Sequence, residues 1–493
     1  MNYVSTRGFA ENNVSSAEAI KRGLAPDGGL YMPETMPKFG AEFIKSLIPL
    51  SYAERSSAVL SAFLTDYTKE ELLTDAALAY AEEKFGPSPA PVSSLHDMHV
   101  LELWHGPTCA FKDMALQLMP RLFTRALKKC GEDKTALILV ATSGDTGKAA
   151  MEGYRDIPGT KIQVFFPTDG VSRVQKLQMQ TGEGENVSVM AIRGNFDDAQ
   201  TGVKRIFSDA SIREELAKNN IFLSSANSIN WGRLVPQVAY YVSAYCDMVA
   251  SGAIRMGEEI DITVPTGNFG NIFAAYIAKL CGLPFHHLVC ASNRNNVLTD
   301  FLANGVYDRN RPFMPSISPS MDILISSNLE RLLYLVCGAD RTANYMKALS
   351  ENGSYKLTDA DFAKIKETFV GYYTTEEQTK ETIRLIFQKE NYLIDTHTAV
   401  AAHAAAQYKS IYKAERKMLT VSTASPYKFA KDVLNALDPS KDIDGLEALE
   451  ALRSATATEI PAPLSGLDRK SVRFSTIIDK DEMADAVMKF AAN

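Results

Sequence analysis

The chain has 493 residues, 46% hydrophobic and 23% charged, a globular composition with enough length for about three domains. Its net charge of −7 argues against a nucleic-acid partner, which needs a basic face. No stretch is long enough for a membrane span, the polar start MNYVSTRGFAENN lacks a signal core, and six scattered cysteines without a C-x-x-C pair indicate reduced thiols in a cytoplasmic protein.

The first part of the chain, residues 1–92, is predicted to be a separate N-terminal domain. It begins with a turn-rich stretch containing paired glycines, GLAPDGGLYMPE. The Ala-, Leu- and Glu-rich stretch from Ser51 to Phe85 predicts helix, and the proline cluster GPSPAPV (Gly86 to Val92) marks a boundary.

Strand and helix patterns then alternate over a central region that we place at 93–450. Buried strands are predicted at TALILVAT, KIQVFFP, IDITVP, HHLVCAS and KMLTVSTAS. A strand, a short polar turn and a helix in repetition predict a parallel sheet covered by helices on both faces. Pro120 should kink the helix that follows Lys112.

The alternation fades between about 295 and 397. LERLLYLVCG and the charged run from Asp359 to Lys389 predict helices there, so we expect a helical insertion. The last segment, 451–493, is expected to pack on the central region.

A lysine stands at the end of the apolar run in LELWHGPTCAFKDMALQL. Lys112 lies between an aromatic residue and an acid, where a strand-like pattern gives way to a helical one. A partly desolvated amine loses its proton and becomes a Schiff-base nucleophile. The alternative is a solvated surface lysine.

A glycine-containing turn, VPTGNFGNIF (Val264 to Phe273), joins a strand to a helix. Gly267 and Gly270 allow backbone N–H groups to approach a bound group closely, and the helix N-terminus favours an anion, so the turn suits a phosphate. It lacks the P-loop lysine and the third glycine of a dinucleotide fingerprint. An ordinary tight turn is the alternative.

A second strand-to-helix turn is ATSGDTGKAA (Ala141 to Ala150). Ser143 and Thr146 offer hydroxyls while Gly144 and Gly147 expose amides, which suits a carboxylate. A helix N-cap at Ser143 or Asp145 is the alternative, and both interpretations can hold together.

Two further segments carry polar groups. In NSINWGRLVPQ, Asn227, Ser228 and Arg233 are candidates for a second phosphate site, with a loop and surface arginine as the alternative. In TVSTASPYKF, Ser422 or Thr423 ends a buried strand, where open parallel sheets bind ligands. A capped strand end is the alternative there.

Taken together, these segments resemble the threonine synthase family of pyridoxal-phosphate enzymes. The shared stretches, in order, are YVSTRG, LAPDGGLYMPE, HGPTCAFKD, TSGDTG, NSINWGR, PTGNFGN, SPSMDILISSNLERLL and DTHTAVAA. The resemblance covers nearly the whole chain and points to the longer bacterial and fungal branch. It implies an α/β protein with the tryptophan-synthase-β-like fold (fold type II): parallel-sheet lobes flanked by helices, an N-terminal domain and a helical insertion.

The resemblance also implies residue roles. Lys112 would be the catalytic lysine that links to the cofactor and shuttles protons, and Thr423 would hydrogen-bond the pyridine nitrogen. The residues that would bind pyridoxal 5'-phosphate are Lys112, Gly267, Asn268, Phe269, Gly270, Asn271 and Thr423. The residues that would bind the substrate are Ser143, Gly144, Asp145 and Thr146 for its carboxylate, and Asn227, Ser228 and Arg233 for its phosphate. No metal ligand is expected.

The implied reaction converts O-phospho-L-homoserine and water to L-threonine and phosphate by γ-elimination and β-addition of water. This lyase of threonine biosynthesis is expected to be a monomer with a small-molecule substrate, without a nucleic-acid or membrane partner. The main alternative is a threonine-synthase-like phospholyase that releases 2-oxobutyrate, ammonia and phosphate. A dehydratase of the same fold would not need the second phosphate site, and an inactive scaffold would not need Lys112.

Two departures from the family pattern lie near the site. The chain has STASPYKF where the family usually has STAHPAKF, so Ser425 and Tyr427 are substituted. It has DTHTAVA in place of DPHTAVA, with Thr396 replacing proline. Neither removes a residue that the chemistry requires.

Overall fold

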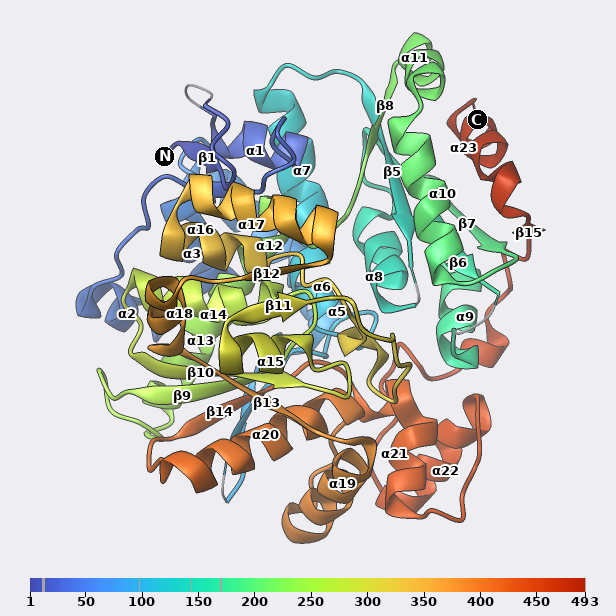
Figure 1. The fold of residues 1–493 in the computed structure, drawn as a ribbon. Coiled ribbons are helices and arrows are strands. Elements are labelled where there is room, and N and C mark those ends of the chain that lie inside the picture. Colours follow the sequence, from blue (N-terminus) through green and yellow to red (C-terminus); the bar gives the residue numbers. More distant parts are fainter. Residues whose placement is uncertain (11–13, 97, 143, 169–170, 493) are drawn as a thin grey trace.

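The computed structural model describes residues 1–10, 14–96, 98–142, 144–168 and 171–492. Within these residues, a large and a small parallel sheet each form the centre of a lobe (Figure 1). The strands of the large sheet are β3 (Val92–Ser94), β4 (His99–Glu102), β9 (Ile260–Pro265), β10 (Phe285–Ser292), β13 (Phe369–Tyr373) and β14 (Met418–Ser422). Their order is β13-β10-β9-β14-β4-β3, and neighbours are parallel except for the edge pair β3 and β4.

The small sheet is parallel throughout. Its strands are β5 (Thr135–Ala141), β6 (Thr160–Pro167), β7 (Val187–Ile192), β8 (Ile221–Ser224) and β15 (Ile477–Ile478). Their order is β15-β7-β6-β5-β8, so a strand from the end of the chain completes this sheet at one edge. The predicted strands of both sheets, and the fold class itself, are confirmed.

Helices cover both faces of the small sheet because its strands are apolar on both sides. The helices of the small lobe are α8 (Asp145–Tyr154), α9 (Arg173–Gln180), α10 (Phe196–Ser208), α11 (Ala210–Lys218) and α23 (Met483–Ala492). Leu137 and Leu139 of β5 pack with α10 and α23 in one core. Their neighbours Ala136 and Ile138 belong to the main core, together with Met151 of α8. This alternation follows from the two-residue period of a strand.

The large sheet is also enclosed by helices. The helices of this lobe that precede residue 295 are α6 (Lys112–Leu116), α7 (Met119–Lys129), α12 (Trp231–Leu234), α13 (Pro236–Ala250) and α14 (Gly270–Cys281). On the opposite face α20 (Thr396–Tyr412) packs against β9, β10 and β14 (Figure 1). The chain then continues through η2 (Pro426–Phe429), α21 (Ala430–Leu437), α22 (Leu446–Thr456), η3 (Leu467–Arg469) and η4 (Lys480–Glu482).

The N-terminal part packs on helices of the large lobe. Its elements are β1 (Tyr3–Ser5), α1 (Ser16–Arg22), β2 (Tyr31–Pro33), α2 (Ala41–Leu47), α3 (Tyr52–Phe63), α4 (Lys69–Ala79) and α5 (Glu82–Phe85). Capping boxes begin α3 at Ser51 and α4 at Thr68, where each hydroxyl accepts from an amide that the helix leaves free. α3 contacts α13 and α1 contacts α7, so this part supports the helices that lead to the site.

The region between 295 and 397 is not purely helical, which corrects our expectation. Its elements are α15 (Val297–Asn304), β11 (Val306–Asp308), η1 (Pro319–Met321), α16 (Leu329–Cys337), α17 (Ala339–Asn352), β12 (Ser354–Lys356), α18 (Asp359–Lys366), β13 and α19 (Glu376–Glu390). β11 pairs with β12, and β13 extends the large sheet beside β10. The sequence FVGYY of β13 is short and lies between charged helices. The helical pattern on both sides therefore led us to predict helix where the chain forms a strand.

Pro120 also acts differently from the expected kink. The helix pattern after Lys112 is split into α6 and α7, and Pro120 lies in the first turn of α7. Its missing N–H costs little there, because the first amides of a helix have no partner within the helix. No helix of the described residues is long and apolar enough to cross a membrane.

The close packing of α8 on α6 yields a stability prediction. A Cβ built at Gly153 of α8 overlaps the carbonyl oxygen of Leu116, a backbone atom at the end of α6. Gly153→Ala should therefore lower the free energy of unfolding by about 1–3 kcal/mol, the usual effect of overpacking. Urea denaturation followed by circular dichroism measures this. Gly40→Ala is the control, because a Cβ there meets open space; an equal effect of the two variants would contradict the packing described.

Candidate functional site

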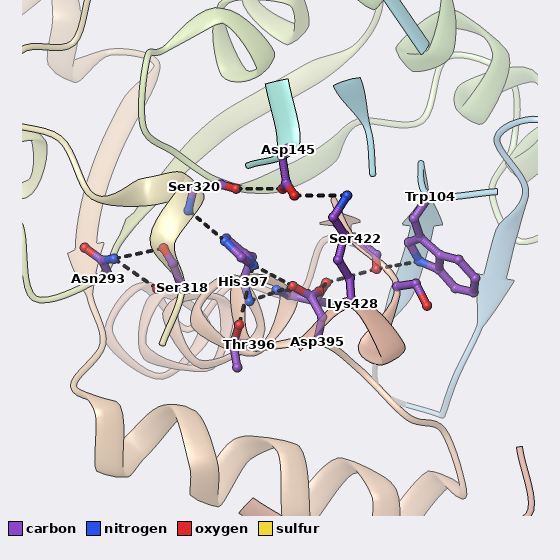
Figure 2. A network of polar contacts seen from close by, with 12 residues as sticks. Trp104, Asp145, Asn293, Ser318, Ser320, Asp395, Thr396, His397, Ser422 and Lys428 are labelled. Carbon is purple, nitrogen blue, oxygen red and sulfur yellow. Dashed lines mark hydrogen bonds and ion pairs between the residues drawn. The ribbon is translucent and has the colours of Figure 1, made fainter. Parts of the chain in front are cut away.

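The predicted site segments meet where the two lobes face each other. Asp145 begins α8 of the small lobe, and Lys112 begins α6. Ser320 of η1 and Lys428 of η2 lie close to Asp145 (Figure 2). The turns involved follow the carboxyl ends of β5, β9 and β14, where ligands of parallel α/β sheets bind.

Lys112 carries a largely buried amine, with one carboxylate of the described residues beside it. Its side chain is 10% exposed, and Nζ lies 3.5 Å from Asp145 Oδ2. Nζ also donates to Ser320 Oγ at 3.4 Å and lies over the ring of Phe111. Burial lowers the pKa of Lys112, Asp145 opposes this change, and the nearby Lys428 and Arg233 cations lower the pKa further. A neutral, reactive amine is thereby favoured.

Asp145 is held at both of its carboxylate oxygens. Oδ1 lies 2.9 Å from Lys428 Nζ and accepts from Gln175 Nε2 at 2.8 Å. Oδ2 accepts from Ser320 Oγ at 3.0 Å and faces Lys112. Burial alone would raise the pKa of this carboxyl, but Lys428 and Lys112 keep it well below its ordinary value. Asp145 is therefore an ionised carboxylate that forms ion pairs with Lys112 and Lys428.

The turn from Gly267 to Asn271 exposes unpaired backbone donors. The N–H groups from Gly267 to Ile272 donate to no acceptor in the described part of the chain. Phe269 adopts a left-handed conformation (φ 63°) as the N-cap of α14, and a Cβ at Gly267 would lie 2.9 Å from Ser320 O. Consecutive free amides at a helix N-terminus form a phosphate site.

Asn271 adds a polar group to this turn. Its Oδ1 accepts from the hydroxyls of Tyr240 and Tyr241, each at 2.6 Å. Its buried Nδ2 has no partner among the described residues. Asn268 is exposed, and its carbonyl accepts from Asn328 N and Nδ2 at 3.1 and 3.0 Å. Among the described residues, this turn therefore keeps backbone donors free, while the Asn268 carbonyl is already occupied.

Thr423 lies next to the lysine segment. Its carbonyl accepts from Phe111 N at 2.8 Å, and Ser425 N donates to Cys109 O at 3.0 Å. The end of β14 is thereby fixed against the residue that precedes Lys112, and the Thr423 side chain is buried there.

The turn between β5 and α8 is organised by Thr142. Thr142 Oγ1 accepts from Gly144 N and Gly147 N, both at 3.0 Å. Gly144 has a φ of 144°, and a Cβ there would collide with Gln175 at 2.6 Å. The amides of Asp145 and Thr146 donate to no acceptor among the described residues. Ser143, a predicted substrate ligand, lies outside those residues.

Arg233 is a buried cation with few partners. It belongs to α12, is 6% exposed, and within the described residues its guanidinium donates only from Nη1, to Ala226 O at 2.6 Å. Burial lowers its pKa to about 10. Arg331 offers a contrast, because its guanidinium is satisfied by Tyr31 O, Asn328 Oδ1 and Ile229 O. A buried arginine with free donors indicates an anionic ligand.

Asn227 and Ser228 come from the loop before α12. Asn227 is exposed and Ser228 is half-buried, and their carbonyls accept from Asn230 N at 3.2 Å and Asn328 Nδ2 at 3.3 Å. Their side chains make no hydrogen bond with other described residues, so both remain free to meet a ligand near Arg233.

A polar network behind Lys112 was not predicted from the sequence. Ser320 N donates to His397 Nε2 at 3.2 Å, and His397 Nδ1 lies 2.7 Å from Asp395 Oδ2 (Figure 2). Asp395 also accepts from Thr398 Oγ1, and the Thr398 hydroxyl lies 2.9 Å from Ser422 Oγ. Ser320, Asp395 and His397 lie in stretches that resemble the family, and Lys428 lies in the stretch STASPYKF that departs from its pattern. Nothing in their residue types marked them as neighbours.

The two departures from the family pattern fit the structure. Tyr427 is buried and its hydroxyl lies 2.8 Å from the Thr458 carbonyl, while Ser425 Oγ accepts from Tyr427 N at 3.3 Å. Thr396 is the first residue of α20. All three lie at helix starts.

One group of possible metal ligands lies elsewhere. Asp261, His286 and His287 have ligand atoms within 4.8 Å of one another. His286 Nδ1 lies 3.1 Å from Asp261 Oδ1, and the Tyr408 hydroxyl bridges His287 Nδ1 and Asp261 Oδ2. This group sits at the amino ends of β9 and β10, away from the turns of the site, and hydrogen bonds account for its geometry.

Family descriptions match almost the whole chain. "Threonine synthase N terminus" matches residues 2–80, "Pyridoxal-phosphate dependent enzyme" matches 95–424, and "Threonine synthase, C-terminal" matches 398–490.

Individual relatives agree with these matches. Threonine synthase of Pseudomonas aeruginosa is 37% identical over 97% of this chain and 96% of its own length. Human threonine synthase-like 1 is 39% identical over 88% of this chain, which spans only 60% of that relative. The crystal structure of pyridoxal-phosphate-bound threonine synthase from Brucella melitensis has a TM-score of 0.88 and 36% identity, with both chains covered completely.

The described residues fit pyridoxal phosphate. A buried amine at Lys112, free amides from Gly267 to Ile272 and the unpartnered Asn271 Nδ2 are the groups that an aldehyde with a phosphate arm requires. The sequence resemblance is confirmed: the chain belongs to the threonine synthase family of pyridoxal-phosphate-dependent enzymes.

Proposed function

We propose that the protein is a threonine synthase that converts O-phospho-L-homoserine and water to L-threonine and phosphate. The observation that carries this proposal is Arg233, a buried guanidinium whose remaining donors have no acceptor among the described residues. The cofactor phosphate is accounted for by the amides of another turn, so Arg233 supports a second phosphate in the same site. A substrate that carries its own phosphate satisfies that requirement.

The proposed cofactor residues are those predicted from the sequence. Lys112 would bind the cofactor covalently, and Thr423 would bond its ring nitrogen. The residues proposed to hold the phosphate are Gly267, Asn268, Phe269, Gly270 and Asn271. Their free amides and the α14 N-terminus bind an anion without bringing a further full positive charge close to Lys112.

The proposed substrate residues lie on both sides of Lys112. Free amides at Asp145 and Thr146 support carboxylate binding by the segment that contains Ser143 and Gly144. The Asp145 carboxylate itself would repel a second carboxylate, so we assign that side chain to the lysines instead. Asn227, Ser228 and Arg233 are proposed to hold the substrate phosphate.

The reaction needs proton transfers that Lys112 is suited to perform. When bound, pyridoxal phosphate supplies an electron sink for charge that develops on the substrate carbons. Lys112 accepts the proton from the α-carbon and returns protons to the substrate. This work requires a neutral amine, and its burial together with the Lys428 and Arg233 cations favours that form.

Arg233 acts at the step in which the γ-phosphate leaves. The leaving group gains negative charge as its bond to carbon breaks, so a fixed guanidinium stabilises the transition state more than the ground state. The Ala226 carbonyl orients Arg233 without neutralising its charge.

Other predictions from the sequence stay proposals. We propose an N-terminal domain at 1–92, a catalytic region at 93–450 and a C-terminal segment at 451–493, together with a monomeric state and a cytoplasmic location. The observed packing of 1–92 on α7 and α13 is consistent with this division.

The first experiment measures the products. Purified protein supplied with O-phospho-L-homoserine should form threonine and inorganic phosphate in equal amounts, measured by chromatography and a phosphate assay. The phospholyase alternative, suggested by the similarity to threonine synthase-like 1, predicts 2-oxobutyrate and ammonia with the same phosphate. That product pattern would replace our proposal with the alternative.

A second prediction concerns Lys112. Lys112→Ala should lower kcat by at least about 10²–10⁴-fold, because proton transfer by a positioned base is lost. Lys112→Arg is the matched control: it keeps a positive charge but provides no neutral amine, so it should be equally impaired. Steady-state kinetics measure both variants, and substantial turnover by either one would contradict the assignment.

A third prediction concerns Arg233. Arg233→Ala should reduce kcat/KM for the phosphorylated substrate about ten- to a hundredfold, which corresponds to about 1.5–3 kcal/mol for charged hydrogen bonds. Cofactor content, measured by absorbance, should stay unchanged. The exposed Arg155 of the neighbouring region serves as a control, since Arg155→Ala removes a cation that already pairs with Glu152 and Glu183. Unchanged kinetics for Arg233→Ala would refute the phosphate assignment.

A further inference from the structure

Two lysines approach the same carboxylate in this site. Lys428 Nζ lies 2.9 Å from Asp145 Oδ1, and Lys112 Nζ lies 3.5 Å from Asp145 Oδ2. The Lys428 side chain has no exposed surface. A charge with this degree of burial is costly unless it is paired, and Asp145 is the carboxylate that pairs with it.

Lys428 has a second partner besides Asp145. Its ammonium donates to Thr108 O at 2.7 Å. Thr108 in turn donates from N and Oγ1 to the carboxylate of Asp113, at 2.8 and 2.7 Å. Asp113 directly follows Lys112 in α6, so the Lys428 ammonium is connected to both the helix of Lys112 and the carboxylate that faces it.

Among the described residues that influence Lys112, the cations outnumber the carboxylates. Asp145 faces it from α8, whereas Lys428 faces it from η2 and Arg233 lies near it from α12. Ser320 of η1 offers a neutral hydroxyl, and its amide is occupied by His397 of α20. Because Lys428 makes the shorter contact with Asp145, Lys112 is left with the longer one.

We propose that Lys428 is a positioning residue that holds the Asp145 carboxylate, prevents a tight ion pair between Asp145 and Lys112, and so leaves the Lys112 amine available to react. The proposal rests on the proposed function only in taking Lys112 as the reacting lysine. Without Lys428, Asp145 keeps Lys112 as its nearest cation, and the amine is more readily protonated. This role does not require Lys428 to touch the substrate.

The test is residue-specific labelling of the full-length, cofactor-free protein. Acetic anhydride acetylates neutral amines, and mass spectrometry gives the rate at Lys112 relative to the exposed Lys69 over a range of pH. Lys428→Met should move the labelling midpoint of Lys112 to higher pH by about one unit or more, because it removes a repelling cation. Below the midpoint this corresponds to at least about tenfold slower labelling.

Two comparisons separate charge from structure. Lys428→Arg should keep the wild-type midpoint, since it keeps the charge. Lys148→Met is the control for loss of a buried lysine in the same region; Lys148 pairs with Glu152 rather than Asp145, so its variant should also keep the midpoint. If Lys428→Met fails to fold by circular dichroism, Lys428→Gln replaces it, because the amide still donates to Thr108 O.

The holoenzyme provides a second readout. In the neutral variant, Lys428→Met or its replacement Lys428→Gln, the acidic limb of the plot of kcat against pH should move to higher pH. Activity should recover at high pH, and KM should stay nearly unchanged. A wild-type midpoint for Lys112 in the folded neutral variant would overturn the proposal. Labelling needs no substrate, so failure to form threonine would contradict the proposed function while the labelling still decides the role of Lys428.

Discussion

The site depends on the contacts that the Asp145 carboxylate makes. It is provided by the small lobe, while Lys112, Lys428 and Ser320 reach it from elements outside that lobe. Burying an ion pair costs solvation energy, which is offset only when the remaining hydrogen-bonding positions are also filled. Here each oxygen of the Asp145 carboxylate has two donor groups as partners. These contacts connect the small lobe to Lys112 and so hold the reactive amine in place.

The two anion sites that we propose use different chemistry. The turn at the start of α14 offers neutral amides and a helix terminus, which hold a permanent phosphate group without adding a side-chain cation. Arg233 offers a full charge on a rigid guanidinium and is oriented by one carbonyl. A phosphate that leaves during the reaction gains more from the charged group, because its own charge increases as the bond breaks. The neutral turn therefore suits the cofactor phosphate, which stays bound, and the charged Arg233 suits the substrate phosphate, which leaves.

The sequence allowed the strands, the turns and the lysine to be predicted because each has a local signature. Apolar runs such as TALILVAT are short and bounded by polar turns, and β5 occupies nearly the predicted range. The strand β13 was missed because its five residues lie between charged helices, and only pairing with β10 makes it part of the sheet. Long-range pairing of this kind leaves no mark on the local pattern.

The roles of Lys428 and Asp145 could not be predicted from the local sequence either. A lysine in STASPYKF gives no sign of being buried, because burial depends on the fold of residues far away in the chain, Thr108 among them. Asp145 was predicted to receive a substrate carboxylate, a role that its motif suggests, but its side chain pairs with two lysines whose positions only the folded chain reveals.

Of these two lysines, we propose that Lys112 carries the cofactor. Borohydride reduction of the holoenzyme makes the lysine linkage permanent, and peptide mapping by mass spectrometry then identifies the modified residue. We expect a single modified site at Lys112, in the peptide that contains CAFKDM. Modification of Lys428, or of any lysine outside the site, would contradict it.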